Sequence, residues 1–179
     1  MTREPGGTRF GERVRELLLE VRQETMSDMA ELLLVFAARA QHLREVIEPA
    51  LAQGQWVLCD RFTDATYAYQ CGGRGIDPSL VSRLETLVQG TLRPDTTILF
   101  DAPVAVGMAR ARDRGELDRF ERESSDFFDA VRQTYLARAQ QDSERFRVID
   151  ASESLPRVQQ SLDAVVVQII ARARTQSAG

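Results

Sequence analysis

Three short apolar runs, each followed by an aspartate, constrain the fold of this chain more than any other feature. They are Trp56–Cys59 before Asp60, Thr96–Phe100 before Asp101, and Phe146–Ile149 before Asp150. Longer segments with the apolar spacing of helices separate these runs. Short apolar strands that alternate with helices are typical of a parallel sheet that helices cover on both faces. We therefore predict an α/β fold with three layers.

The aspartates indicate where a site would lie. In open α/β sheets, ligands bind outside the carboxyl ends of the strands. An aspartate after a strand is also a common turn residue. The repetition after all three runs favours a site at this edge, and the pattern alone leaves both interpretations open.

The predicted helices follow from periodicity and capping residues. Asp28 with Glu31 forms a plausible capping pair, Pro49 should kink or end the second helix, and Asp77 should cap the helix that begins at Pro78. No repeat or linker divides the sequence, so we predict a single domain, 1–179. The segment Gln70–Gly75 reads as a polar loop. Besides the helix from Pro78, helices are expected at Phe10–Arg22, Asp28–Gly54, Val104–Arg112, Asp126–Gln141 and Pro156–Arg174.

Composition excludes several classes of function. The net charge of −4 argues against broad nucleic-acid binding. No apolar run could cross a bilayer and no secretion signal opens the chain, so we expect no membrane partner and a cytoplasmic location. Two cysteines and one histidine are too few for a disulfide framework or a cysteine-based metal site. All 23 basic residues are arginine, and no lysine is present.

Four clusters occur in a fixed order along the chain. They are Thr2-Arg3-Glu4-Pro5-Gly6-Gly7-Thr8, Phe36-Ala37-Ala38-Arg39, Asp60-Arg61-Phe62 with Thr66-Tyr67-Ala68-Tyr69-Gln70, and Arg114-Gly115-Glu116-Leu117-Asp118-Arg119. Together they closely resemble bacterial thymidylate kinase, from Thr2 to beyond Asp150. The resemblance implies a P-loop nucleoside monophosphate kinase fold with a lid at about 112–123. It also implies a homodimer that phosphorylates dTMP to dTDP with ATP and Mg²⁺, in dTTP biosynthesis.

The resemblance places the substrate phosphate beside Asp60-Arg61. An arginine projected from a strand end can grip a monophosphate through two parallel hydrogen bonds. Asp60 would serve the metal indirectly. The plainer alternative is an Asp–Arg pair on the surface.

The second helix would recognise the base. Relatives stack an aromatic ring on thymine and use an arginine one turn later, which here implies Phe36 and Arg39. In relatives the ring usually lies one residue earlier, where this chain has Val35, so either position could face thymine. Arg39 lies in an apolar helix, and an unpaired buried guanidinium is costly, which favours a ligand role.

Further substrate contacts are implied for Glu4, Pro5 and the segment after Arg61. Thr66 and Gln70 could bond the pyrimidine edge, and Tyr69 resembles a residue that crowds the sugar and excludes a 2′-hydroxyl. Arg74 belongs to the same segment. The alternative is that these polar residues only bond their own backbone.

Fewer residues match the part of the family's site that binds ATP, the phosphoryl donor. Arg114 and Arg119 match the arginines of a lid that closes over the transferring phosphoryl group. Asp150-Ala151 resembles the start of the loop beside adenine.

Relatives also carry a first strand, a Gly-x-x-x-x-Gly-Lys-Ser/Thr loop and a helix that hold the ATP phosphates. This sequence contains no such loop and no lysine. We therefore expect an N-terminal truncation, for which a misplaced start codon is a natural explanation. The lost strand would be central, between Trp56–Cys59 and Thr96–Phe100.

Two functions therefore compete. One is an ATP-dependent dTMP kinase that is recorded incompletely or inactivated by truncation. The other is a non-catalytic remnant that binds a deoxynucleotide or a partner chain. A kinase for dUMP or dCMP is a more distant third.

Overall fold

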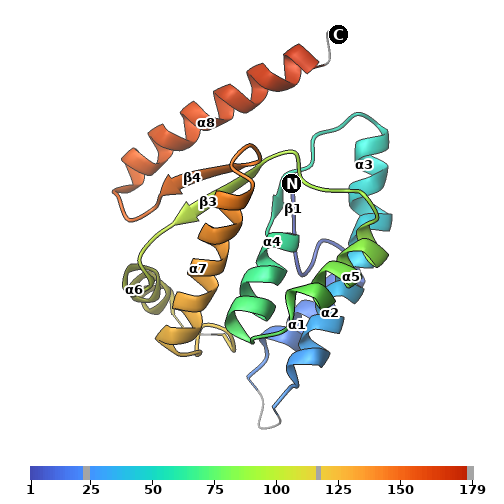
Figure 1. Cartoon of the computed structure of the whole chain (residues 1–179), viewed down its shortest axis with the longest axis vertical. Coiled ribbons are helices and arrows are strands. Elements are labelled where there is room, and N and C mark those ends of the chain that lie inside the picture. Colours follow the sequence, from blue (N-terminus) through green and yellow to red (C-terminus); the bar gives the residue numbers. More distant parts are fainter. Residues whose placement is uncertain (22–24, 116–117, 177–179) are drawn as a thin grey trace.

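The computed structural model describes residues 1–21, 25–115 and 118–176, and its strands form two small parallel sheets (Figure 1). β1 (Thr2–Arg3) pairs with β2 (Cys59–Asp60), with Arg3 opposite Asp60. β3 (Thr97–Asp101) pairs with β4 (Phe146–Asp150), with Asp101 opposite Asp150. The three aspartates thus end three strands of parallel pairs, as the sequence predicts.

The strands do not form one continuous sheet in the described residues, since β2 and β3 share no ladder hydrogen bonds there. The predicted strand at Trp56–Cys59 is also shorter, because β2 begins at Cys59. Trp56 and Leu58 are 66% and 62% exposed, so this run is not buried. Apolar strand residues become buried only when neighbours cover their faces.

The N-terminal half contains α1 (Arg9–Leu19), α2 (Asp28–His42), η1 (Leu43–Ile47) and α3 (Glu48–Ala52). α1 ends before the predicted Arg22, which lies outside the described residues. The cap of α2 is Ser27, whose side chain accepts from the Ala30 amide, so the predicted Asp28–Glu31 capping pair is wrong. The long helix changes to π-helical winding at η1, before Pro49.

The middle of the chain is more helical than predicted. α4 (Thr63–Thr66) continues into η2 (Tyr67–Gly73), a π-helix, where we predicted a loop from Gln70. A Cβ on Gly73 would lie 2.3 Å from the Phe127 ring, so glycine here allows η2 to pack closely on the helix that carries Phe127. α5 (Pro78–Gln89) begins as predicted, with the Asp77 carboxylate accepting from the Ser79 amide.

The C-terminal half contains α6 (Val104–Arg114), α7 (Ser125–Gln141) and α8 (Leu155–Gln176), close to the predicted bounds. α7 packs against η2, and α8 lies along β4, away from α1 and α2 (Figure 1). No helix in the described residues is long and apolar enough to cross a membrane.

Three small apolar clusters, rather than one core, hold the helices together. Val14 and Leu18 join α1 to α2, Phe36 and Val81 join α2 to α5, and Phe127 lies among aromatic side chains between α7 and η2. The second and third clusters include side chains of η2, Tyr67 and Cys71 in one and Ala68 and Tyr69 in the other, so η2 packs against apolar side chains on two sides.

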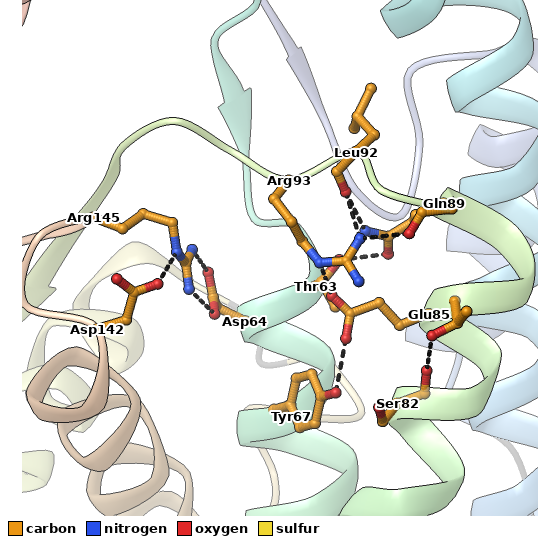
Figure 2. A network of polar contacts seen from close by, with 12 residues as sticks. Thr63, Asp64, Tyr67, Ser82, Glu85, Gln89, Leu92, Arg93, Asp142 and Arg145 are labelled. Carbon is orange, nitrogen blue, oxygen red and sulfur yellow. Dashed lines mark hydrogen bonds and ion pairs between the residues drawn. The ribbon is translucent and has the colours of Figure 1, made fainter.

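A polar network also fixes the segment α4–η2, as Figure 2 shows. Arg145 donates to Asp64 at 2.6 Å and to Asp142 at 2.8 Å, so it links α4 to the start of β4. Burial by itself would raise the pKa of Asp64, but hydrogen bonds from Arg145 and the charge of Arg138 bring that pKa below its ordinary value. Further along, Tyr67 donates to Glu85 at 2.7 Å and joins η2 to α5.

Candidate active site

A polar cavity of about 100 Å³ lies between α1, α2, β2 and the segment α4–η2. Most of the residues predicted to bind substrate line it. They are Glu4, Pro5, Arg39, Arg61, Thr66, Tyr69 and Gln70, together with Arg15, Phe62 and Phe120 among others.

Arg61 is the strongest indication of a ligand. It follows β2 with φ of 64°, a conformation that costs a non-glycine residue about 1–2 kcal/mol and often marks a functional site. Its guanidinium lies 5.0 Å from the centre of the Tyr69 ring. Within the described residues this guanidinium has no hydrogen-bond or ion-pair partner.

The charge of Arg61 persists in this environment. Desolvation by the surrounding protein opposes it, but Tyr69, Tyr135, Asp60 and Asp118 together hold the pKa of Arg61 above its ordinary value. Arg61 is exposed, and a charged guanidinium without a hydrogen-bond or ion-pair partner among the described residues is available to bind a phosphate.

Arg15 is a second cation of this cavity, and the sequence analysis missed it. Its guanidinium donates to the Pro5 carbonyl at 3.2 Å. Burial lowers the pKa of Arg15, and the positive charges of Arg3 and Arg61 lower it further. Arg15 lies on α1 between the buried Val14 and Leu18, and an arginine beside the buried face of an amphipathic helix was the available signal.

Arg39 is 1% exposed, and protein groups satisfy its guanidinium. It donates to Glu4 at 2.7 Å, to Thr66 at 2.9 Å and to Gln89 at 3.4 Å. The rings of Phe36 and Phe62 lie 4.9 Å and 5.0 Å from it. The cost of an unpaired guanidinium therefore no longer argues for a ligand role, although Arg39 still lines the cavity.

Glu4 connects this pair to His42, which is fully buried. Its second oxygen lies 2.9 Å from Nδ1 of His42, whose Nε2 lies 2.6 Å from the Thr2 hydroxyl. A Cβ on Gly7 would come within 2.5 Å of the same imidazole, so only glycine fits there. The cluster anchors β1 and the turn after it to α2.

The structure does not bring Phe36 to the cavity. Its ring is 3% exposed and packs with Leu32 and Val81, while Val35 reaches the cavity wall. Phe62 and Phe120 supply the aromatic surface there instead. Helix phase decides this, because adjacent residues on α2 point about 100° apart.

Thr66, Tyr69 and Gln70 reach the cavity from α4 and η2 rather than from a loop. The Thr66 hydroxyl accepts from Arg39, and the Gln70 amide donates to Glu31 at 2.9 Å. Tyr69 packs edge-on against Phe120 at 5.7 Å. The π-helical winding sets which of these side chains face inward.

Arg74 and Arg119 both bind Glu31, which is 1% exposed. Arg74 also pairs with Glu123 at 2.6 Å, and Arg119 donates to the Leu18 carbonyl at 2.7 Å. Neither arginine lines the polar cavity. They instead tie the segment between α6 and α7 to α1 and α2.

Comparison with known proteins identifies the family. The model of the thymidylate kinase family matches residues 1–162. The chain belongs to the thymidylate kinase family. Members of this family are nucleoside monophosphate kinases, which are transferases.

Two bacterial relatives and one solved structure illustrate the similarity. The thymidylate kinase of Pseudomonas savastanoi pv. phaseolicola is 61% identical over 95% of this chain and 81% of that protein. That of Pseudomonas putida GB-1 is 60% identical over 97% of this chain and 83% of that protein. The crystal structure of thymidylate kinase from Ehrlichia chaffeensis superposes with a TM-score of 0.71 at 33% identity, over 92% of this chain and 78% of that one.

The remaining predicted residues of this thymidylate kinase family member are Asp60, Arg114, Asp150 and Ala151. Asp60 is exposed at the end of β2. Arg114 ends α6, and its side chain lies outside what the structure describes. The Asp150 carboxylate accepts from the Ser152 amide at 2.8 Å, and the Ala151 carbonyl accepts from Arg110 at 2.6 Å.

A second, larger cavity of about 350 Å³ adjoins the polar one, and Arg61 and Tyr69 line both. We call it the β3 cavity, because Leu99, Phe100 and Asp101 form one wall. Its other walls are mainly apolar side chains of α6 and α7, including Val104, Met108, Phe128 and Val131. The charge of Asp101 is satisfied by Arg132, which donates to both of its oxygens at 2.7 Å and 2.9 Å.

Proposed function

We propose that this chain binds dTMP in the polar cavity and serves its phosphorylation to dTDP by ATP. Arg61 carries the proposal, because it is charged, lines the cavity and has no hydrogen-bond or ion-pair partner for its guanidinium among the described residues, beside a second cation, Arg15. In this pose Arg61 and Arg15 hold the phosphate, while Thr66, Gln70 and Arg39 lie toward the base. Tyr69 lies between them, against the sugar.

Transfer from ATP needs the two phosphate groups in line and their charge neutralised. Mg²⁺ would supply that neutralisation, and Asp60 would serve the metal indirectly. The Asp60 carboxylate is exposed beside Arg61, and no hydrogen bond or ion pair to it occurs among the described residues. One or two carboxylates with phosphate oxygens suffice for Mg²⁺, so the lack of a larger acidic cluster in the described part of the chain fits this ion.

We further propose that residues outside these 179 complete the donor site. Two observations support this. The sequence has no lysine for the ATP phosphates. The facing edges of β2 and β3 are unpaired in the described structure, beside the apolar wall of the β3 cavity. A further strand could pair with these unpaired edges. The chain by itself would then bind a deoxynucleotide without turnover, which is the second candidate function.

Arg61→Ala tests the phosphate assignment in the chain as it stands. Loss of a charge-assisted contact should weaken dTMP binding by about 1.5–3 kcal/mol. Thymidine, which has no phosphate, should bind nearly as before. Calorimetric titration with both ligands measures the difference, and equal losses for both would contradict the assignment.

ADP release with dTMP and ATP tests the donor side. We expect no measurable turnover from the 179 residues, because positioning both phosphates is most of this catalysis. A version preceded by a strand and a Gly-Lys-Ser/Thr loop, assayed at the same concentration, should be active. Comparable turnover by the two forms would refute this part of the proposal.

We also propose a cytoplasmic homodimer formed through α2. Met29, Leu33 and Ala37 lie on one exposed face of that helix, and Leu33 is 50% exposed although apolar. Apolar helix faces of this kind are typical of obligate interfaces. Sedimentation of the unaltered chain and of Leu33→Glu should give a dimer and a monomer. A monomer in both cases would count against the interface.

A further inference from the structure

Glu31 is a buried carboxylate that the binding site described above does not use. It is 1% exposed on α2 and lies outside the lining of both cavities. Three side chains from two other segments donate to it: Gln70 and Arg74 from the region of η2, and Arg119 from the segment before α7.

The bonds to its two oxygens are distributed unevenly. Oε1 accepts from the Gln70 amide nitrogen at 2.9 Å and from Nε of Arg74 at 3.3 Å. Oε2 accepts from one terminal nitrogen each of Arg74 and Arg119. Oε1, the oxygen that Gln70 contacts, thus accepts one hydrogen bond from arginine, whereas Oε2 accepts two.

This arrangement fixes the orientation of the Gln70 amide. A carboxylate only accepts hydrogen bonds, so the NH₂ group of Gln70 must face Glu31 and its carbonyl oxygen must point the other way. Gln70 is 3% exposed and lines the polar cavity. No side chain in the described ranges donates to that carbonyl oxygen, so the oxygen is free to accept from a ligand.

The cavity therefore offers an acceptor at this point. Thymine and uracil carry a hydrogen on N3 and an acceptor at O4, whereas cytosine carries an acceptor at N3 and a donor at N4. An acceptor from Gln70 matches the first pattern and opposes the second. Arg39 lines the same cavity, and the two N–H groups that remain after its bonds to Glu4, Thr66 and Gln89 suit an O4 acceptor.

We propose that Glu31 is a positioning residue that sets the base specificity of the site by orienting Gln70. The substrate class is a pyrimidine monophosphate with a protonated N3, thymine or uracil rather than cytosine. The inference rests on the proposed function, because it takes the polar cavity to be the dTMP site.

Glu31→Gln gives a sharp test, because it preserves shape and changes one atom. The two arginines can only donate, so they will keep the single oxygen of the new amide on their side. The NH₂ group of that amide will then face Gln70, which must turn its own carbonyl toward it and its NH₂ toward the cavity. That donor suits N3 of cytosine.

The measurement is calorimetric binding of dTMP, dUMP and dCMP to the 179-residue chain. We expect the preference of the unaltered chain for dTMP over dCMP to fall about tenfold or more in Glu31→Gln, because a mismatched donor or acceptor in a buried site carries a cost of this order. The dTMP to dUMP ratio should not change. In a Gln70→Leu background, Glu31→Gln should leave the dTMP to dCMP ratio unaltered.

Glu123→Gln is the matched control. This substitution removes one carboxylate partner of Arg74, since Glu123 pairs with that arginine at 2.6 Å. Glu123 does not contact Gln70. The base preference of the variant should remain that of the unaltered chain. Equal weakening of dTMP and dCMP by Glu31→Gln would show a purely structural role and overturn the inference.

A second readout does not depend on the folding of Glu31→Gln. The N3 imino proton of bound dTMP should be protected from exchange, and visible by NMR, in the unaltered chain but not in Gln70→Leu. An imino signal that persists in Gln70→Leu would refute the contact. If the unaltered chain binds no dTMP at all, the proposed function fails, and this inference with it.

Discussion

The half of the molecule around β1, β2, α1, α2 and α5 differs from the half around β3, β4 and α8 in how completely its side chains are covered. In the first half, Leu18 and His42 are fully buried, and the charged Arg39 and Glu4 are paired with each other. In the second, Phe100 and Val148 on the strands are 48% and 51% exposed. These side chains of the first half are thus buried and paired, while the strands of the second half leave Phe100 and Val148 partly exposed to solvent.

The difference shows what positions a binding site in this fold. The first half relies on buried polar contacts between distant segments, each satisfied by a partner, and such networks hold a unique arrangement. The second half is held by strand pairing, by the partly exposed ion pair of Arg132 with Asp101 and by contacts with α7, with α8 on the outer side (Figure 1). Substitutions of the buried, paired side chains should therefore cost far more than substitutions of the exposed apolar ones.

The largest expected effect is that of Arg39→Ala. It leaves the Glu4 carboxylate, 3% exposed, without its principal partner, and breaking a buried ion pair costs about 3–5 kcal/mol. Urea unfolding followed by circular dichroism measures the loss. Arg3→Ala, which breaks the exposed pair with Glu12, is the control and should cost much less, because solvent screens an exposed pair. Similar losses for the two variants would remove the contrast between buried and exposed pairs.

Asp64→Asn should have an intermediate effect that depends on pH. The pKa of Asp64 is lower in the folded chain than its ordinary value, so the ionised form is favoured by folding. Its stabilisation is present above the unfolded pKa of about 3.9 and is lost as pH falls through the lower folded pKa.

At pH 7 the Asp64→Asn variant should be less stable by about 1–3 kcal/mol, and the gap should narrow below about pH 4. Thermal melts across this range provide the comparison. Asp77→Asn should change little at pH 7, because asparagine also caps helices well. A gap that stayed constant down to about pH 2 would mean that the charge of Asp64 is not what stabilises the contact.

The smallest effect is expected for Trp56→Ser in the 179-residue chain. Trp56 is 66% exposed, so its loss should alter stability by no more than about 0.5 kcal/mol. Leu18→Ala, at a fully buried position, should cost about 2–5 kcal/mol under the same conditions. Equal costs would show that Trp56 is covered in solution, for example by a second chain.

Local patterns in the sequence determined the elements whose ends depend on nearby residues. Asp77 and Pro78 begin α5, and β3 and β4 end at Asp101 and Asp150, because a cap or a strand end involves residues only a few positions apart. The α/β class and most helix bounds followed in the same way. The motif clusters also indicated most of the residues that line the polar cavity.

The tertiary structure alone decided which side chains meet. Arg39 binds Glu4, which lies 35 residues away in the sequence, and Glu31 binds Gln70, which lies 39 residues away. Local spacing in the sequence could therefore predict neither pair. The same contacts removed the argument for an unpaired Arg39 and placed Phe36 in the core. Burial of a charge requires a partner, but the sequence does not say which one, because that depends on how helices distant along the chain pack against one another.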